Sequence, residues 1–314
     1  MNFRVLPRCV ASATLLFAVR LGAQAAVVPI ASPADVAISQ GRLDDAEQAL
    51  YAASSRAAHE PSARGALGMF LASRGRLKVG VVLLEEAREF GGDALVIDAR
   101  LARIYSWLGD WTSVAALKHY AVSGPEFDRA RWLAAHAPGR NGPDSVMVAL
   151  EPNELAGLGR IELKIGGTTM QADINPNVEG LVLPSTAAMS AESQQFGMRD
   201  SGSVAVVYEV GIGAMRLSNV PARLYPTARA TIGLDVLASL TPTFDAGSHR
   251  IALRQRPAST SGDPLPILLS FPGVRLVTRI GQAPVAIESA AGRAAVRGTR
   301  WTFDVRRGTV VTER

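Results

Sequence analysis

Apolar side chains follow a helical period through the first half of the chain, and this pattern recurs every 34 residues. Gly41, Gly75 and Gly109 mark the three copies. Glycine accepts the left-handed backbone conformation that commonly ends a helix. The pattern therefore predicts three helical hairpins, each with its glycine in the turn.

A small or slim residue stands five positions after each turn glycine, at Ala46, Gly80 and Val114. Such residues let the two helices of a hairpin cross closely. In its order of large apolar, small and turn positions, the chain resembles the tetratricopeptide repeat over about residues 27–124. Stacked hairpins share one core. We therefore predict a helical repeat domain over residues 27–137, with a capping helix at its end.

The repeat resemblance implies a concave surface that binds peptides. The first helix of each pair would line this surface, with Met69, Arg103 and Ser106 pointing into it. An alternative carries equal weight, because a short array can simply support a second domain.

The pattern changes from helical to alternating after a run of turn-forming residues from Pro138 to Asp144. Two alternating segments, 160–165 and 169–174, flank Gly166-Gly167 and predict a hairpin. Further strands are expected at 180–183, 203–210, 214–217 and 222–225, with a helix at 234–240 and a closing hairpin at 244–253. The sequence thus predicts a multidomain α + β protein whose second domain is a small β-barrel.

The order of these elements over residues 145–254 resembles the retropepsin-like aspartic peptidases. The residues that carry the resemblance are the hairpin above, Gly180-Leu181-Val182-Leu183 and the apolar-glycine step at Ile232-Gly233. The family's Asp-Thr/Ser-Gly triplet should begin five residues before Gly180, where the chain has Asn175-Pro176-Asn177. Two carboxylates share a proton in that family, and an amide cannot take part. The resemblance therefore implies a peptidase fold with a degenerate motif.

Two nearby carboxylates could restore activity. Asp173 lies two residues before Asn175, and it lacks the Thr/Ser-Gly that should follow. Asp200-Ser201-Gly202 has the family's letters but lies too close to Ile232 for the intervening strands. We interpret Asp200 as part of a turn in a mobile loop.

Residues 262–314 are β-rich, and two interpretations of this segment carry equal weight. Ile280-Gly281 followed by Glu288 parallels Gly167 followed by Asn175, and 301–304 parallels 243–245. On this interpretation the segment is a truncated second lobe with Glu288 near the place of the second aspartate. Alternatively, it is an unrelated tail that packs on the barrel.

The first 25 residues predict a secretory signal peptide. Arg4 and Arg8 precede an apolar run from Val10 to Val19, and Ala23-Gln24-Ala25 supplies a cleavage site. The run is too short to span a bilayer, and Cys9 lacks a lipoprotein context. We therefore expect export, with a periplasmic location and no transmembrane segment in the mature chain.

Charge gives little support for nucleic-acid binding, although the formal net charge is +5. Three of the surplus arginines belong to the predicted signal, and the remaining surplus is concentrated in the last sixty residues. That basic segment could contact an anionic envelope surface. No motif predicts a cofactor, and the four histidines have no metal-ligand spacing.

These observations lead to two hypotheses about function. The preferred one is a periplasmic protein- or peptide-binding module with a catalytically inactive peptidase-like domain, because a barrel cleft can still bind extended peptides. The alternative is an active aspartic endopeptidase that uses a displaced carboxylate.

Overall fold

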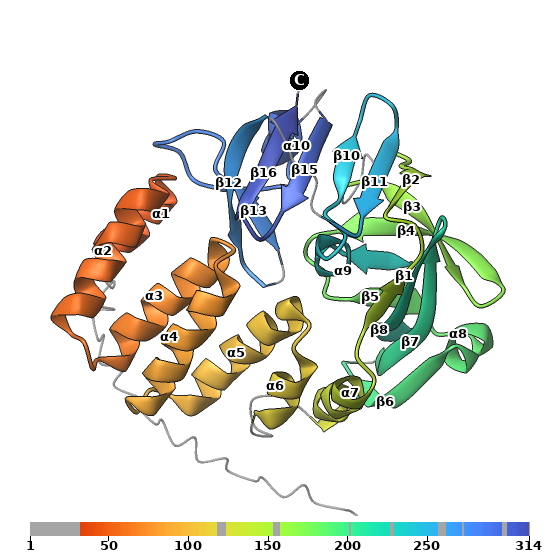
Figure 1. The fold of residues 1–314 in the computed structure, drawn as a ribbon, viewed down its shortest axis with the longest axis horizontal. Helices are drawn as coiled ribbons and strands as arrows, with labels where there is room; N and C mark the ends of the chain where they lie inside the picture. Colours follow the sequence, from red (N-terminus) through yellow and green to blue (C-terminus); the bar gives the residue numbers. More distant parts are fainter. Residues whose placement is uncertain are drawn as a thin grey trace, which may run out of the picture. The chain divides into compact units, whose positions relative to one another are not determined.

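The structure is a computed structural model that describes residues 32–117, 124–152, 158–200, 202–226, 229–256, 262–271, 273–296 and 300–313. A helical region comes first and a β region follows (Figure 1). The predicted signal peptide, residues 1–25, lies outside the described residues, as does Cys9.

The helical region consists of successive helices joined by short turns. Its elements are α1 (Pro33–Ser39), α2 (Leu43–Arg56), α3 (Pro61–Ser73), α4 (Leu77–Glu89), α5 (Ala94–Leu108), α6 (Trp111–Ala116) and α7 (Gly124–Ala135). Local sequence explains several helix starts. Ser32 and Asp35 form a capping box at α1, and the side chains of Asp93 and Asp110 cap α5 and α6.

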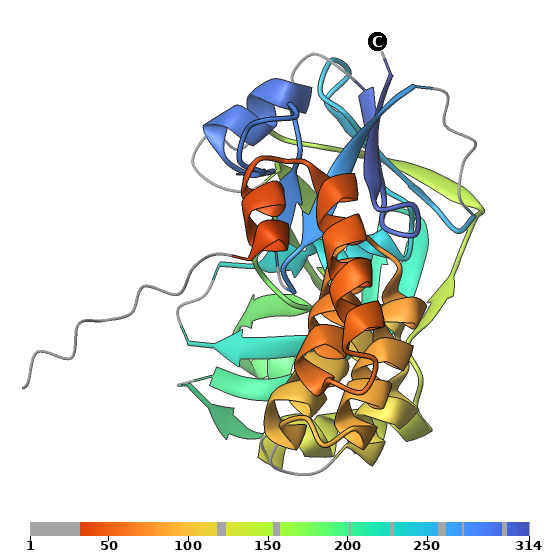
Figure 2. The same ribbon diagram turned by 90° about the vertical axis from the view of Figure 1, so that its left-hand side faces the viewer.

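The three turn glycines adopt the left-handed conformation that the repeat predicted. Their φ angles are +65° at Gly41, +80° at Gly75 and +71° at Gly109. The close crossing is also present in the second copy, because a Cβ atom on Gly80 would lie 2.7 Å from the carbonyl oxygen of Gly68. Figure 1 shows α2 to α6 side by side in chain order, and in Figure 2 α1 and α2 lie in front of the later helices.

The β region begins with a closed barrel, as predicted. Hydrogen-bonded neighbours run around the ring in the order β8-β5-β9-β4-β3-β7 and back to β8. The strands are β3 (Arg160–Ile165), β4 (Thr168–Asn175), β5 (Leu181–Pro184), β7 (Gly202–Ile212), β8 (Met215–Tyr225) and β9 (Thr231–Gly233). Strands β1 (Gly139–Asn141) and β6 (Ser193–Arg199) extend this sheet at its two edges, and helices α8 (Ala187–Ala191) and α9 (Leu234–Ala238) interrupt it.

Two sequence-based expectations for this region were wrong. The segments 214–217 and 222–225 are one strand, β8, because β7 pairs with it on both sides of Asn219 and Pro221. The residues before Asp200 are not a mobile loop, since β6 pairs with β7 and makes Asp200 part of a hairpin turn. In both places pairing with β7 overrides local turn preferences.

The C-terminal residues are built into a second sheet together with the ends of the barrel segment. Its order is β14-β13-β12-β16-β15-β10-β11-β2. The strands are β2 (Ser145–Ala149), β10 (Thr243–Asp245), β11 (Arg250–Arg254), β12 (Asp263–Leu269), β13 (Val274–Leu276), β14 (Val285–Ala286), β15 (Arg300–Asp304) and β16 (Thr309–Glu313), with α10 (Ala290–Val296) between β14 and β15.

The contact between β10 and β15 lies inside this sheet. Thr243 is opposite Thr302, and their buried hydroxyl oxygens are 2.8 Å apart. Phe244 is opposite Trp301, and their rings stack with centroids 4.0 Å apart. The 243–245 and 301–304 segments, which are similar in sequence, therefore pair with each other across the sheet.

Helices and sheets share their cores. One apolar cluster includes Leu84 and Leu101 of the helical region together with Ile161 of the barrel and Phe303 of the second sheet. A smaller cluster joins Leu71 and other residues of α1 to α4 with Leu268 of β12 and Val277, which follows β13. Burial of this apolar surface fixes the helical region against the β region.

Candidate functional site

The degenerate motif lies where β4 ends. Strand β4 runs parallel to β9, which places Asn175 opposite Gly233. The Asn175 side-chain oxygen accepts the Asn177 backbone N–H at 2.9 Å. This turn directs the chain away from the sheet immediately after β4, and it presents the Asn177 side chain to the C-terminal segment.

Asn177 contacts Glu288, which the sequence placed near a second catalytic position. The Asn177 side-chain amide donates a hydrogen bond of 2.8 Å to Glu288 Oε1. The other carboxylate oxygen, Oε2, is buried and has no hydrogen-bond partner among the described residues. The structure therefore brings the degenerate motif and Glu288 together, although they are 111 residues apart in the chain.

The backbone around Glu288 is held by its neighbours on α10. Arg293 donates a side-chain hydrogen bond to the Glu288 carbonyl oxygen. The Ser289 hydroxyl accepts the Gly292 N–H at 3.0 Å and donates to the Ala286 carbonyl oxygen at 2.6 Å. These contacts fix the segment that carries Glu288 at the start of the helix.

An amide and a carboxylate cannot act as the proton-sharing pair of an aspartic peptidase. The Asn177 amide can donate hydrogen bonds, but it does not take up or release a proton near neutral pH. Two carboxyl groups that share one proton are required so that one activates water while the other protonates the substrate. The Asn177–Glu288 contact supplies only one titratable group.

The candidate carboxylate Asp173 pairs with an arginine. Asp173 is opposite Arg160 in the β3–β4 hairpin, and Arg160 Nε donates to its carboxylate at 2.8 Å. It points to the same face of β4 as Asn175, since the two residues are separated by one position. The ion pair joins the two strands of this hairpin.

The candidate Asp200 belongs to an ionic network that joins α7 to the barrel. Buried Glu126 on α7 accepts Arg223 at 2.7 Å and Arg199 at 3.0 Å. Asp200 lies 3.4 Å from Arg199 and 3.8 Å from Arg223. Burial lowers the pKa of the neighbouring Arg129. The Glu126 ion pairs tie this part of the barrel to α7, and Asp200 contacts the same two arginines from an exposed position.

Asp235 is a functional candidate that the sequence analysis missed. It follows the apolar-glycine step on α9, and both of its carboxylate oxygens accept the Gly180 N–H, at 2.9 and 3.2 Å. Burial raises the pKa of Asp235 to about 6, and the negative charge of Glu179 acts in the same direction. An acidic residue two positions after Ile232-Gly233 was the available signal in the sequence.

The three predicted peptide-contact residues lie on α3 and α5. Met69 is partly buried and packs against the main apolar cluster. The Ser106 hydroxyl donates to the Ala102 carbonyl oxygen of its own helix at 2.8 Å. Arg103 is exposed. Of the three, Arg103 is therefore the residue with both charge and exposure to offer a ligand.

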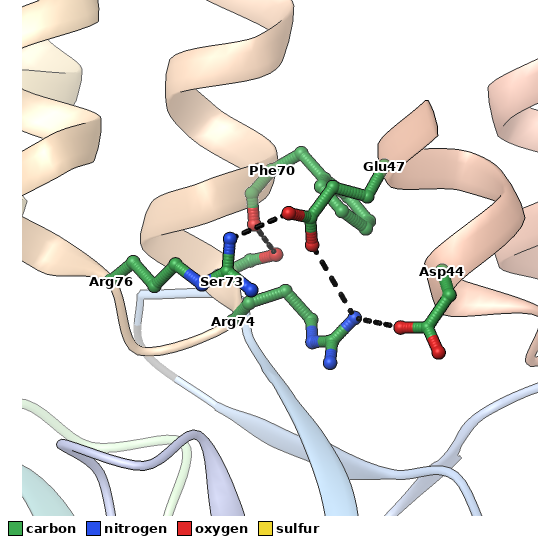
Figure 3. Close-up of polar contacts among 6 residues, drawn as sticks. All are labelled: Asp44, Glu47, Phe70, Ser73, Arg74 and Arg76. Atoms are coloured by element: carbon green, nitrogen blue, oxygen red, sulfur yellow. Dashed lines mark hydrogen bonds and ion pairs between the residues drawn. The ribbon is translucent and has the colours of Figure 1, made fainter. Parts of the chain in front are cut away.

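A charged cluster joins the first two repeats beside their turns (Figure 3). Arg74, which follows α3, lies 3.5 Å from Asp44 and 4.0 Å from Glu47 on α2. Arg76 lies 2.5 Å from the other Glu47 oxygen. Opposite charges are paired across neighbouring hairpins, so the cluster sets the position of α2 relative to the turn at Gly75.

Two neighbouring hollows lie between the helical region and the β region. One, of about 340 Å³, has Asp235, Arg140 and Trp107 among its lining residues. The other, of about 660 Å³, has Trp107, Lys78 and Arg306 among its lining residues. Because Trp107, Leu108 and Ser239 line both hollows, we treat the two as one groove, the Trp107 groove.

The described ranges contain no group of three or more His, Cys, Asp or Glu side chains that could hold a metal ion. His136 stacks on Trp132 with ring centroids 4.2 Å apart, and His59 lies edge-on to Phe90 at 5.0 Å. His119 is outside the described residues. None of the helices in the described part of the chain is both long and apolar enough to cross a bilayer.

Comparison with known proteins finds similarity in structure. No family model matches the chain, and no curated protein matches it. Among solved structures, it is similar to the crystal structure of a retropepsin-like aspartic protease from Rickettsia conorii, with 10% identity and a TM-score of 0.28. The match covers 37% of this chain and 92% of that chain. At this level of similarity, any chemistry has to be inferred from the chain's own residues.

Proposed function

We propose that this chain is an exported peptide-binding protein whose aspartic-peptidase-like β domain has lost its catalytic pair. The observation that carries this proposal is the Asn177–Glu288 hydrogen bond of 2.8 Å, because it joins Glu288 to a motif that has Asn175 in place of the catalytic aspartate and so offers only one titratable group. The helical region is proposed to be a tetratricopeptide-like array, and residues 1–25 to direct export to the periplasm.

Strand pairing supports a two-lobed origin of the β domain. We propose that residues 262–314 are a truncated second lobe related to the barrel segment by an approximate two-fold axis. In the second sheet, β10 and β11 on one side correspond to β15 and β16 on the other, and β2 corresponds to β12. Strand β2 leads through β3 and β4 to Asn175, and β12 leads through β13 and β14 to Glu288.

The truncation itself argues against catalysis. In the barrel, β4 is followed by the strands from β5 to β9 before α9 begins. After Glu288, α10 begins directly at Ala290. The second lobe lacks these strands, so it encloses a bound chain less completely than a full lobe would. An open surface of this kind suits binding of an extended chain better than exclusion of water around a reacting bond.

Hydrolysis and binding assays on the purified chain test the proposal. We expect no cleavage of peptide substrates above background between about pH 3 and 7, with or without pepstatin. We also expect measurable binding of a subset of fluorescent peptides by polarisation. Asp173→Asn, Asp200→Asn and Glu288→Gln should leave the absence of cleavage unchanged.

Pepstatin-sensitive cleavage that Asp173→Asn or Asp200→Asn abolishes would overturn the proposal in favour of an active endopeptidase. Asp128→Asn is the matched control, because Asp128 is an exposed carboxylate on α7. Absence of both cleavage and peptide binding would also reject the proposal.

A further inference from the structure

The larger hollow of the Trp107 groove has a one-sided charge. Its lining residues include the cations Arg76, Lys78 and Arg306 and no acidic residue. Arg76 is paired with Glu47, whereas Lys78 and Arg306 are exposed. Cations gathered over a concave surface produce a positive potential that attracts anionic groups.

The fold brings these cations together from distant parts of the sequence. Arg76 and Lys78 begin α4 directly after the second turn glycine, and Arg306 lies in the turn between β15 and β16. A Cβ atom on Gly75 would overlap the Val305 carbonyl oxygen, so the two turns touch backbone to backbone. This contact holds the cations of the two turns side by side.

The rest of the groove is largely apolar. Trp107 and Leu108 are half-buried at its centre, and the ring of Trp107 is fixed by an edge contact with Phe271 at 5.7 Å. The smaller hollow continues the surface with Leu217 and Val220. The groove thus has cations at one end and an apolar surface along the rest. This arrangement suits a ligand that has acidic groups followed by apolar groups.

The smaller hollow contains one acid and one base, and both have partners. Asp235 accepts the Gly180 N–H, and Arg140 donates to the Ser239 carbonyl oxygen at 2.5 Å. The net positive charge of the groove is therefore concentrated at its larger end.

We infer that the Trp107 groove binds an extended acidic peptide. Acidic side chains lie against Lys78 and Arg306, and apolar side chains lie along Trp107 and the smaller hollow. This inference rests on the proposed peptide-binding function and moves the binding surface from the predicted helix face at Arg103 to the junction with the β region. A recessed, elongated surface fits a peptide better than a flat membrane.

Fluorescence polarisation with defined probes tests the inference on the full chain. The probes are a labelled decapeptide that alternates Glu with Leu and Phe, and the same decapeptide with Gln in place of Glu. We expect the acidic probe to bind at least about tenfold more tightly than the Gln probe in low salt, with a loss of affinity as salt rises. The double variant K78E/R306E should weaken acidic-probe binding by about tenfold or more.

Arg56→Glu is the matched charge reversal, because Arg56 is exposed on α2 and does not line the groove. It should change acidic-probe binding by less than about twofold. Circular dichroism and thermal melting verify that all variants are folded.

Other outcomes overturn the inference in distinguishable ways. If the Gln probe binds as tightly, or if Arg103→Glu weakens binding and the double variant does not, peptide binding stands and its location in the groove is rejected. If neither probe binds, the proposed function fails as well. Binding to phosphatidylglycerol vesicles that is lost in the double variant, without binding of the acidic probe, would assign the cations to a membrane surface.

Discussion

The three repeat turns have the same local structure and different surroundings. Gly41, Gly75 and Gly109 all adopt left-handed conformations at the ends of their helices. The first two touch the C-terminal segment, since a Cβ atom on Gly41 would lie 2.8 Å from the Gln282 carbonyl oxygen and one on Gly75 would overlap Val305. A Cβ atom on Gly109 would meet nothing within 4 Å, and Gly109 lines the Trp107 groove.

The difference separates two reasons for a glycine at the same repeat position. Backbone conformation requires it in all three turns, whereas close approach of another segment requires it only in the first two. The array is therefore docked to the β region by two turns and leaves the third beside an open groove. Substitutions at these positions measure the two requirements separately.

The largest effect is expected for Gly75→Ala. Alanine is strained in the left-handed backbone conformation of this turn. Its methyl group would also overlap backbone atoms of Val305 and Gly308, so the β15–β16 turn has to move away. We expect a loss of about 4 kcal/mol in the free energy of unfolding, measured by urea denaturation. Gly124→Ala, at a helical glycine with open space around it, is the control and should change stability by less than about 1 kcal/mol.

A smaller loss, about 2–3 kcal/mol, is expected for Gly41→Ala. Its methyl group would meet the Gln282 carbonyl oxygen at 2.8 Å and a methyl of Val277 at 2.9 Å. The Val277 side chain can rotate, so part of the overlap can be relieved. Losses of equal size at Gly41 and Gly109 would show that the docking contact at the first turn contributes nothing beyond backbone strain.

Asp235, which lines the smaller hollow together with Gly109, gives a pH-dependent prediction. Burial raises the pKa of Asp235 to about 6, above the value of about 3.9 for an unfolded chain. The folded state therefore binds this proton more tightly, and the contribution of Asp235 to stability rises as pH falls from 6 towards 4. Its charge costs stability above pH 6.

Asp235→Asn removes this charge and keeps an oxygen that can accept the Gly180 N–H. We expect a gain of about 1–2 kcal/mol at pH 7.5 and a flatter stability profile between about pH 4 and 6, measured by chemical denaturation at each pH. If the two stability profiles are identical, water reaches the Asp235 carboxylate, and Asp235 is then as open to solvent as Gly109.

Periodicity was sufficient to predict the local part of this structure. The left-handed glycines and the hairpin at 160–175 follow from residue type and spacing, so the sequence reveals them. Strands β6 and β8 were misjudged because their pairing with β7 outweighs the turn preference of Asn219 and the polar character of 193–199. Neither effect is local, so neither can be read from a single segment.

The residues of the candidate site could be predicted from the sequence, but the contacts between them could not. The sequence singled out Asn177 and Glu288 separately, and their hydrogen bond depends on how the segment after β14 meets the turn after β4. The Trp107 groove was not foreseen, because its cations come from the α4 start and the β15–β16 turn and only the contact at Gly75 brings them together.

The smallest effect is expected for Gly109→Ala. The new methyl group enters open space, so only the left-handed conformation opposes it, at a cost of about 1 kcal/mol in the free energy of unfolding. Gly109→Asn should lose less, because asparagine tolerates this conformation better than alanine. Urea denaturation of both variants checks the order. If Gly109→Ala instead loses as much as Gly75→Ala, the third turn must be covered in solution by something that contacts Gly109, and it would no longer differ from the other two.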